Sequence, residues 1–262
     1  MYYIDHYKIK DIPLLEVGPQ ESKSKPLPVV IFIHGFTSAK EHNLHYAYYL
    51  AEKGFRVLLP ECDLHGERSK GSSAMELSLQ FWNIVIKTIH ELEDLHTYLV
   101  EENKLKGDSI GVAGTSMGGI ITLGALTQFE WIKAAVSLMG NPSYIGFAQM
   151  QIDGIQKQGI PIPFTDEQLQ AQLDALKAYD LSIQPDLLKK RPLMFWHGEK
   201  DGTVPFAHAH EFYEKVKNLY NESPTLIQFH RDPKADHKVS RYGVLKTVEW
   251  FEQHLKVSQL TS

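Results

Sequence analysis

The sequence has little cysteine, no long apolar run and no large excess of one charge. Cys62 is the single cysteine among 262 residues, which excludes an internal disulfide framework and a thiolate zinc site. No window reaches the roughly 18 consecutive apolar residues that a membrane span needs, so no span is expected. Residues 1–10 lack the basic segment and apolar core of a signal peptide. The predicted compartment is therefore the cytoplasm.

The charge balance is mildly acidic. Lys and Arg number 27 against 32 Asp and Glu, a formal net charge of −5. Without the basic stripe that phosphate backbones require, we expect no nucleic-acid partner. Hydrophobic residues make up 43% of the chain, enough for a sizeable core. A wholly disordered chain is excluded, and the length allows one or two domains.

Apolar runs alternate with helical patterns along most of the chain. The continuous β-branched run at 29–33, Val-Val-Ile-Phe-Ile, is typical of a strand buried on both faces of a parallel sheet. The alternation predicts a doubly wound, mostly parallel α/β fold with helices on both faces. The predicted strands are residues 2–9, 12–17, 29–33, 55–59, 109–113, 134–139, 192–196 and 226–230. The predicted helices are 42–53, most of 75–102, 117–128, 206–220 and 239–257.

Residues 141–190 interrupt this alternation of strands and helices because they contain no convincing strand. Helices are predicted at 150–158 and 165–179, separated by the Gly-Ile-Pro-Ile-Pro breaker at 159–163. Thr165 followed by Gln168 resembles a capping box. We expect one domain over residues 1–262, in which 141–190 form a small helical cap inserted over one end of the sheet.

The strongest local signal is Gly-Thr-Ser-Met-Gly-Gly at 114–119, between a predicted strand and a predicted helix. This is the strand–turn–helix context of a Gly-x-Ser-x-Gly nucleophile elbow. Small residues two before and two after Ser116 permit a tight turn, and the following helix offers free backbone N–H groups. Ser116 is therefore the predicted nucleophile.

A serine hydroxyl needs a base to take its proton. The sequence holds 13 histidines, so position must decide among them. His237 follows the last predicted strand and precedes the last helix, and the order serine, acid, histidine suits this fold. His237 is the predicted base, whereas His230 and His254 are expected to be structural or solvated.

The orienting acid should follow the penultimate strand. Asp201 lies there in a glycine-bounded turn before Val204-Pro205, where it can hold the His237 ring and stabilise its protonated form. The competing acids are Glu199, Asp232 and Asp236.

An oxyanion needs two backbone donors. Met117, directly after the nucleophile, offers one N–H, and the loop after the strand at 29–33 should offer the other. Gly35 lets that backbone approach closely, so Phe36 N–H is the expected second donor. The Phe36 side chain is a candidate pocket residue, and His34 more plausibly shapes the loop than performs acid–base work.

These features together resemble the α/β-hydrolase superfamily. The matching segments are 34–36, 114–119, 197–205 and 236–237, which occur in the family's order and span most of the chain. The nearest resemblance is to the small bacterial YitV-like esterase group, near the prolyl-oligopeptidase and dienelactone-hydrolase-like branches, and residues 32–44 and 131–134 carry it. The resemblance implies an eight-stranded sheet, a serine nucleophile, no cofactor and hydrolysis of an ester or related acyl bond. Dienelactone hydrolases use a cysteine nucleophile, and this chain has Ser116 there.

Other candidates carry weaker patterns. Residues 63–69 resemble the Gly-His-Gly-x-Ser loop of lipase-like hydrolases, and we interpret His65 and Arg68 as support near the site, with substrate contact as the alternative. His42 and His45 have the spacing of a metal pair but no evident third ligand, so no metal site is predicted.

The predicted function is hydrolysis of carboxylic esters of small molecules through an acyl-enzyme on Ser116. The predicted pocket residues are His34, Tyr144, Phe147 and Met150, with core packing of the cap as the alternative. A peptidase or amidase on the same three residues stays open, as does a non-catalytic binding protein of the same fold. The sequence does not decide the oligomeric state, a homodimer included.

Overall fold

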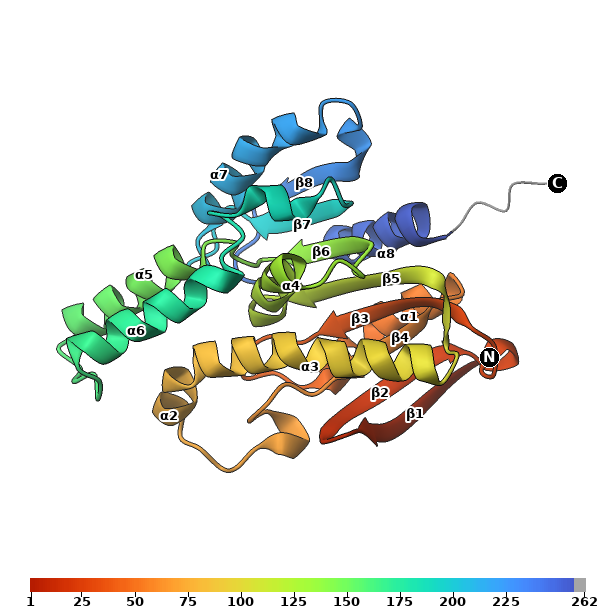
Figure 1. Cartoon of the computed structure of the whole chain (residues 1–262), viewed down its shortest axis with the longest axis horizontal. Helices are drawn as coiled ribbons and strands as arrows, with labels where there is room; N and C mark the ends of the chain where they lie inside the picture. Colours follow the sequence, from red (N-terminus) through yellow and green to blue (C-terminus); the bar gives the residue numbers. More distant parts are fainter. Residues whose placement is uncertain (257–262) are drawn as a thin grey trace.

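The computed structural model describes residues 1–256, and its centre is an eight-stranded sheet (Figure 1). The strand order is β1-β2-β4-β3-β5-β6-β7-β8. The strands are β1 (Tyr2–Ile9), β2 (Ile12–Pro19), β3 (Leu27–Ile33), β4 (Arg56–Pro60), β5 (Leu105–Thr115), β6 (Ala134–Leu138), β7 (Leu193–Gly198) and β8 (Ile227–Asp232). The predicted α/β fold class is confirmed.

Six strands run parallel, and the N-terminal hairpin lies at one edge. β1 pairs antiparallel with β2, and β2 pairs antiparallel with β4. From β4 through β3, β5, β6 and β7 to β8, every pair is parallel. The carboxyl ends of these strands therefore meet at one edge of the molecule, where doubly wound folds place their sites.

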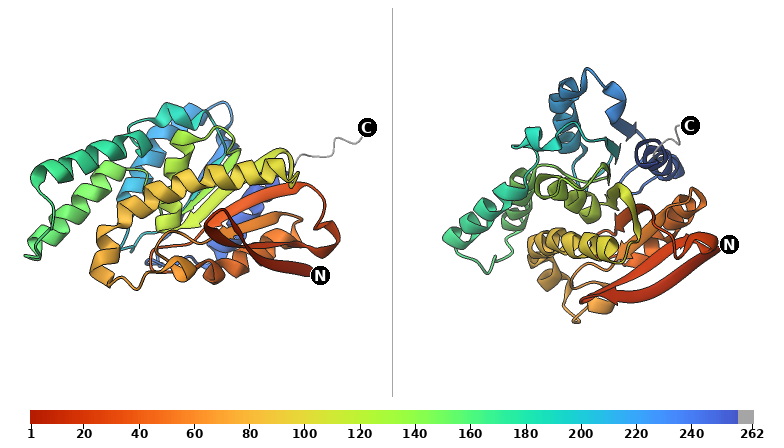
Figure 2. Two further views of the ribbon diagram at one scale, coloured as in Figure 1. Left: turned by 60° about the horizontal axis from the view of Figure 1, so that its bottom comes forward. Right: turned by 45° about the vertical axis from the view of Figure 1, so that its right-hand side comes forward.

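Helices cover both faces of the sheet (Figure 2). The long helices α3 (Phe81–Glu101), α4 (Met117–Gln128) and α7 (Phe206–Val216) pack their apolar residues on one face. The helices α1 (Leu44–Glu52) and α8 (Arg241–Leu255) cover the other. β3 leads to α1 and its neighbour β5 leads to α4, so the chain leaves these adjacent strands toward opposite faces. A crevice at their carboxyl ends follows from this reversal.

Several predicted boundaries differ from the structure. The predicted helix over 75–102 is two helices, α2 (Ala74–Leu79) and α3, joined at Gln80. α2 begins at its own capping box, in which Ser73 and Glu76 bond reciprocally. Phe81 and Trp82 are then buried at the start of α3. The helix predicted from residue 42 begins as a 3-10 turn and becomes α1 at Leu44, and the predicted end of the last helix, Val257, lies outside the described residues.

Residues 141–190 form two helices that extend beyond the carboxyl ends of the parallel strands (Figures 1 and 2). They are α5 (Tyr144–Lys157) and α6 (Asp166–Leu176), followed by short 3-10 turns. The Thr165–Gln168 capping box is confirmed. The structure describes all of this segment, and within it there is no strand. α5 begins six residues before the predicted start, because the Tyr144 hydroxyl anchors its first turn to the carbonyl of Ile120 at 2.6 Å.

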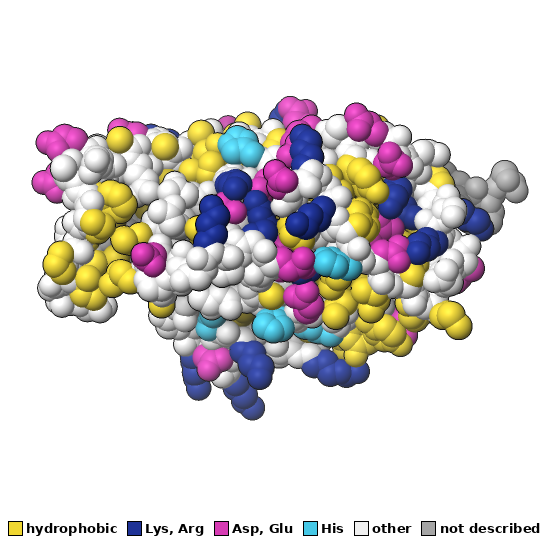
Figure 3. All heavy atoms as spheres, turned by 90° about the horizontal axis from the view of Figure 1, so that it is seen from below, with side chains coloured by type: hydrophobic (Ala, Val, Ile, Leu, Met, Phe, Trp, Pro, Cys, Tyr) yellow, Lys and Arg dark blue, Asp and Glu magenta, His cyan; other side chains and the backbone are white. Residues whose placement is uncertain are grey.

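One surface of the described part of the molecule carries mixed charges (Figure 3). Basic and acidic side chains alternate over it, and apolar side chains gather at the end that α5 and α6 form. Among residues 1–256, no helix is both long and apolar enough to cross a membrane.

Candidate active site

Ser116 lies in a strained turn between β5 and α4. Its φ of 54° and ψ of −117° fall outside the regions that a serine ordinarily adopts. The turn needs glycine on either side: a Cβ on Gly114 would lie 2.4 Å from the Gly118 backbone, and one on Gly118 would lie 2.1 Å from the carbonyl oxygen of Ile33. These close approaches lock the elbow against the end of β3.

Ser116, His237 and Asp201 form one chain of hydrogen bonds. His237 Nε2 lies 2.8 Å from Ser116 Oγ, and His237 Nδ1 lies 2.7 Å from Asp201 Oδ2. The three residues come from the β5–α4 turn, the segment after β7 and the segment after β8. The structure therefore brings together three side chains that are as much as 121 residues apart.

Asp201 is fixed as an anion by four groups. Its Oδ1 accepts from the N–H groups of Thr203 and Val204, each at 2.9 Å. Its Oδ2 accepts from His237 and also lies 3.3 Å from His197 Nε2. Burial by itself would raise the pKa of Asp201, but the hydrogen bonds from the two histidines and the two backbone N–H groups hold that pKa well below its usual range.

His197 is the neighbour of the site to which the sequence assigned no role. It is buried at the end of β7, and its Nε2 also lies 2.9 Å from the carbonyl oxygen of Val204. The ring therefore bridges the two ends of the turn that presents Asp201. Its position in the sequence, four residues before Asp201 and at the end of the penultimate strand, is the feature from which this role could have been predicted.

The loop after β3 lies directly beside the elbow. A Cβ on Gly35 would be 3.5 Å from Ser116 Cβ, so the glycine allows this approach. Within residues 1–256, the N–H groups of Phe36 and Met117 have no hydrogen-bond acceptor in the protein. Both expected oxyanion donors are thus unpaired near Ser116.

His65 holds the loop that carries Phe36. The Thr37 N–H donates to His65 Nε2 at 2.9 Å, and His65 Nδ1 lies 2.8 Å from the carbonyl oxygen of Asp63. Burial lowers the pKa of His65, which favours the neutral ring that this acceptor role requires. Arg68 makes a two-bond pair with Glu91, and neither residue 65 nor 68 lines the cavity at Ser116. This agrees with their interpretation as support.

A cavity of about 180 Å³ opens beside Ser116. None of the side chains that line it carries a charge. They are Phe36, Ser78, Phe81, Ser116, Ile120, Phe147, Met150, Gln151, Thr203 and Val204.

Two of the four predicted pocket residues line this cavity, namely Phe147 and Met150. Tyr144 and His34 do not. Tyr144 is fully buried and bonds to α4 instead. His34 is fully buried too, with Nδ1 2.8 Å from the Gly35 carbonyl oxygen and Nε2 lying 3.0 Å from the Cys62 backbone nitrogen and 3.1 Å from Glu61 Oε1. The structure therefore places both rings behind the cavity wall.

The competing acids serve other local roles. Asp232 Oδ1 accepts from the backbone N–H groups of Lys234 and Ala235. Glu199 lies 3.5 Å from Arg231, and Asp236 is exposed.

The described residues hold one cluster of carboxylates with metal-like spacing, formed by Glu41, Glu61 and Glu67. The Lys40 ammonium already contacts all three at 2.5–2.9 Å. Because this cation satisfies the cluster, we assign no metal site to it. His42 bonds to Ser38, and His45 packs against Tyr46 with the two rings tilted by 42°.

The model of the prolyl oligopeptidase family matches residues 41–258. The chain belongs to the prolyl oligopeptidase family. Its members share the α/β-hydrolase fold observed here, so this protein of the prolyl oligopeptidase family is a hydrolase. The expected superfamily is confirmed.

Curated relatives of the family agree with this assignment. The chain is 52% identical to the Bacillus subtilis (strain 168) protein named "Putative esterase YitV", over 97% of this chain and 100% of that one. It is 30% identical to "Esterase YjfP" of Escherichia coli (strain K12), over 97% and 100%. It is also 24% identical to the human "Acylamino-acid-releasing enzyme", over 92% of this chain but 33% of that one.

Solved structures show the same fold at low identity. TT1662 from Thermus thermophilus superimposes with a TM-score of 0.77 at 18% identity, covering 98% of this chain and 99% of that one. The acylaminoacyl peptidase of Pyrococcus horikoshii gives 0.68 at 19% identity, over 98% of this chain and 42% of that one. Proteins that share this fold therefore include one named as a peptidase, whereas two relatives matched over their whole length are named as esterases.

Proposed function

We propose that the protein hydrolyses carboxylic ester bonds of small, uncharged substrates, with Ser116 as nucleophile, His237 as base and Asp201 as the orienting acid. One observation carries the proposal. The Ser116–His237–Asp201 chain of hydrogen bonds opens on a small cavity whose lining has no charged side chain.

The hydrogen bonds support a two-step acyl transfer. Ser116 Oγ attacks the ester carbonyl while its proton passes to His237 Nε2, and the ionised Asp201 stabilises the resulting imidazolium. The N–H groups of Phe36 and Met117 receive the oxyanion. His237 then protonates the leaving alcohol. In the second step a water molecule attacks the acyl carbon as His237 takes one of its protons, and His237 then returns that proton to Ser116 Oγ as the carboxylic acid departs.

The uncharged lining favours an ester hydrolase over an aminopeptidase. An exopeptidase that binds a free amine needs a carboxylate in reach of that amine. No Asp or Glu lines the cavity beside Ser116. Two relatives that match over their whole length support the same proposal, since both are named as esterases.

Residues 141–190 fit the role of a cap in this proposal. α5 supplies Phe147, Met150 and Gln151 to the lining. The other side of the cavity comes from the β5–α4 elbow, the Phe36 loop and the α2–α3 junction. The cap would thereby exclude water from the acyl group and set the size of substrate that fits.

The first test is Ser116→Ala with p-nitrophenyl acetate and butyrate as substrates. We expect kcat/KM to fall by at least about 10³-fold, because loss of the nucleophile leaves only binding and oxyanion contacts. Ser24→Ala, a change at an exposed serine remote from the cavity, should leave kcat/KM within about twofold of the unmodified protein. Full activity in Ser116→Ala would contradict the mechanism.

The same preparations separate the two alternatives. A fluorophosphonate probe should form an adduct at Ser116, and no adduct together with no turnover would favour a non-catalytic binding protein. Comparing aryl esters with aminoacyl-arylamides tests the peptidase alternative. Faster cleavage of the arylamides would replace the esterase assignment.

A further inference from the structure

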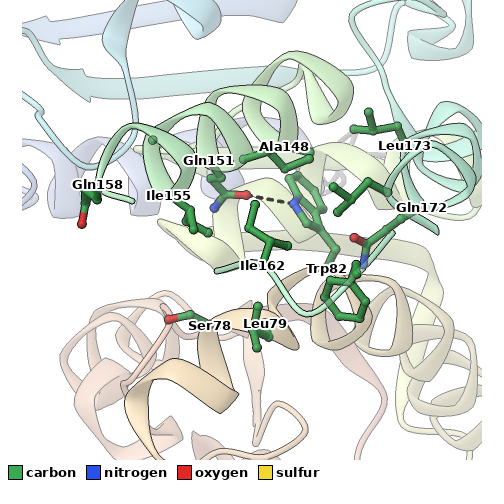
Figure 4. Close-up of a pocket in the computed structure, with 14 residues that line it drawn as sticks. Ser78, Leu79, Trp82, Ala148, Gln151, Ile155, Gln158, Ile162, Gln172 and Leu173 are labelled. Carbon is green, nitrogen blue, oxygen red and sulfur yellow. Dashed lines mark hydrogen bonds between the residues drawn. The ribbon is translucent and has the colours of Figure 1, made fainter. Parts of the chain in front are cut away.

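A second, larger cavity lies under the pair α5–α6 (Figure 4). Its volume is about 290 Å³. α5 and α6 form one side of it, and the α2–α3 junction, with Ser78, Leu79 and Trp82, forms the opposite side. The other lining residues are Ala148, Gln151, Ile152, Gly154, Ile155, Gln158, Ile162, Phe164, Leu169, Gln172 and Leu173.

The second cavity adjoins the one beside Ser116. Ser78 and Gln151 line both. Gln151 is held in place because Trp82 Nε1 donates to its Oε1 at 2.9 Å (Figure 4). The two cavities therefore meet at the side chains of Ser78 and Gln151.

The chemistry of the second cavity selects an apolar occupant. None of its 14 lining side chains is Asp, Glu, Lys, Arg or His. The polar groups of its side chains are one hydroxyl, three amides and the indole N–H of Trp82, which donates to one of those amides. Such a lining offers nothing to a phosphate, an ammonium or a carboxylate and suits a hydrocarbon chain.

The position of His237 decides which part of an ester points this way. The leaving oxygen must lie next to His237 Nε2 to receive its proton. His237 lines neither cavity, so the alcohol portion faces away from both. The acyl portion is then directed past Phe147 and Met150 toward Gln151 and Ser78.

We propose that the second cavity holds the distal part of a medium-length acyl chain, so that the substrates are esters of medium-chain fatty acids. This inference rests on the proposed ester hydrolysis at Ser116. The carboxyl end of the chain occupies the cavity beside Ser116, and the methyl end passes Gln151 into the space between α2 and α5–α6.

Gly154 gives a way to fill the second cavity without disturbing the first. It lines only the second cavity, and a Cβ built on it meets no atom within 4 Å. It lies inside α5, where residues other than glycine are favoured. Gly154→Phe should therefore fold and place a ring in the chain's path. Gln156→Phe, at an exposed position of α5 that lines neither cavity, adds the same ring elsewhere.

The experiment compares two isomeric esters, ethyl octanoate and octyl acetate, together with p-nitrophenyl acetate and p-nitrophenyl octanoate. We expect Gly154→Phe to lower kcat/KM for ethyl octanoate and p-nitrophenyl octanoate by at least about tenfold. Octyl acetate and p-nitrophenyl acetate should stay within about twofold, which also shows that the variant is folded. Gln156→Phe should match the unmodified protein on all four.

Each other outcome has a defined meaning. A loss confined to octyl acetate would assign the second cavity to the alcohol side, and equal losses for both isomers would show that the cavity does not select the acyl portion. Either result would overturn the proposal. Unchanged hydrolysis of both octanoates by Gly154→Phe would show that the cavity binds no part of the substrate. If hydrolysis of the acetate persists in Ser116→Ala, the proposed function itself fails, and that result does not depend on Gly154.

Discussion

At the scale of single residues, Asp201 is the most heavily supported group of the candidate site. Two backbone N–H groups hold one carboxylate oxygen, and two histidine rings contact the other. A carboxylate bound in this way stays ionised at any pH at which His237 could act as a base. We therefore expect the pH–rate profile to show no titration of Asp201 over the pH range in which the protein is active.

His197→Phe tests whether the second histidine positions Asp201. The substitution keeps a ring of similar size but removes the contacts to Asp201 Oδ2 and to the Val204 carbonyl oxygen. We expect kcat for p-nitrophenyl acetate to fall roughly tenfold with little change in KM, because the acid is displaced while the cavity is unaltered. His197→Asn, which keeps an N–H donor, should recover part of the loss.

The matched control for His197 is His230→Phe. His230 lies in the neighbouring strand β8 and contacts Gln228 and Tyr242 instead of Asp201. The kcat of the His230→Phe variant should stay within about twofold of that of the unmodified protein. Equal losses in the two variants would mean that His197 acts only through general packing.

At the scale of elements, the β5–α4 elbow and the end of β3 are built against each other. Gly118 lies so close to the carbonyl oxygens of Ile33 and His34 that a Cβ would be 2.1 and 2.9 Å from them. Neither atom is the end of a flexible side chain. Moving β3 would also move Gly35 and Phe36, which follow it directly.

Gly118→Ala should consequently damage both stability and the site. We expect a loss of more than about 2 kcal/mol in the free energy of unfolding and the loss of fluorophosphonate labelling at Ser116. Gly154→Ala is the matched control, since it too replaces a glycine within a helix but meets open space. It should stabilise by about 0.5–1 kcal/mol. Urea unfolding measures both, and equal effects would refute the packing argument.

Elements that depend on neighbouring residues could be predicted from the sequence, whereas elements that depend on contacts between residues far apart in the chain could not. Adjacent residues determine both the strand at 29–33 and the capping box of Thr165 and Gln168, and both appear where predicted. The start of α5 depends on the contact between Tyr144 and Ile120, 24 residues apart. The elbow was predictable because its glycines and serine adjoin in sequence. The position of His197 depends on its contacts with Asp201 and with the Val204 carbonyl oxygen in the turn after β7. Hydrophobic periodicity does not predict such contacts.

At the scale of the whole molecule, two buried ionic networks tie distant segments together. Arg56 of β4 bonds to Glu16 of β2 and to the carbonyl oxygens of Lys23, Lys25 and Lys104. Near the Phe36 loop, Glu61 receives the Lys40 ammonium at 2.9 Å. Removing one partner of such a buried ion pair lowers the stability of the folded state strongly, because the remaining charge is left buried without a counter-charge.

The second network makes the folded state sensitive to acid. Burial alone would raise the pKa of Glu61, but the contacts from His34 and Lys40 lower it from 4.5 to about 2. Since the unfolded chain then binds the proton more tightly, this stabilisation is complete above about pH 4.5 and disappears as the pH falls toward about 2. Its size is up to about 3 kcal/mol.

Glu61→Gln should therefore lower the free energy of unfolding at pH 7 by about 2–3 kcal/mol and flatten its fall between pH 4.5 and pH 2. Urea unfolding at a series of pH values measures both effects. Glu130→Gln removes an exposed carboxylate paired with Lys189 and should leave the free energy of unfolding close to that of the unmodified protein, because solvent screens such a pair. If Glu61→Gln keeps the full acid slope of the unmodified protein, the proton uptake belongs to other carboxylates, and the Lys40–Glu61 pair is not what makes the folded state acid-sensitive.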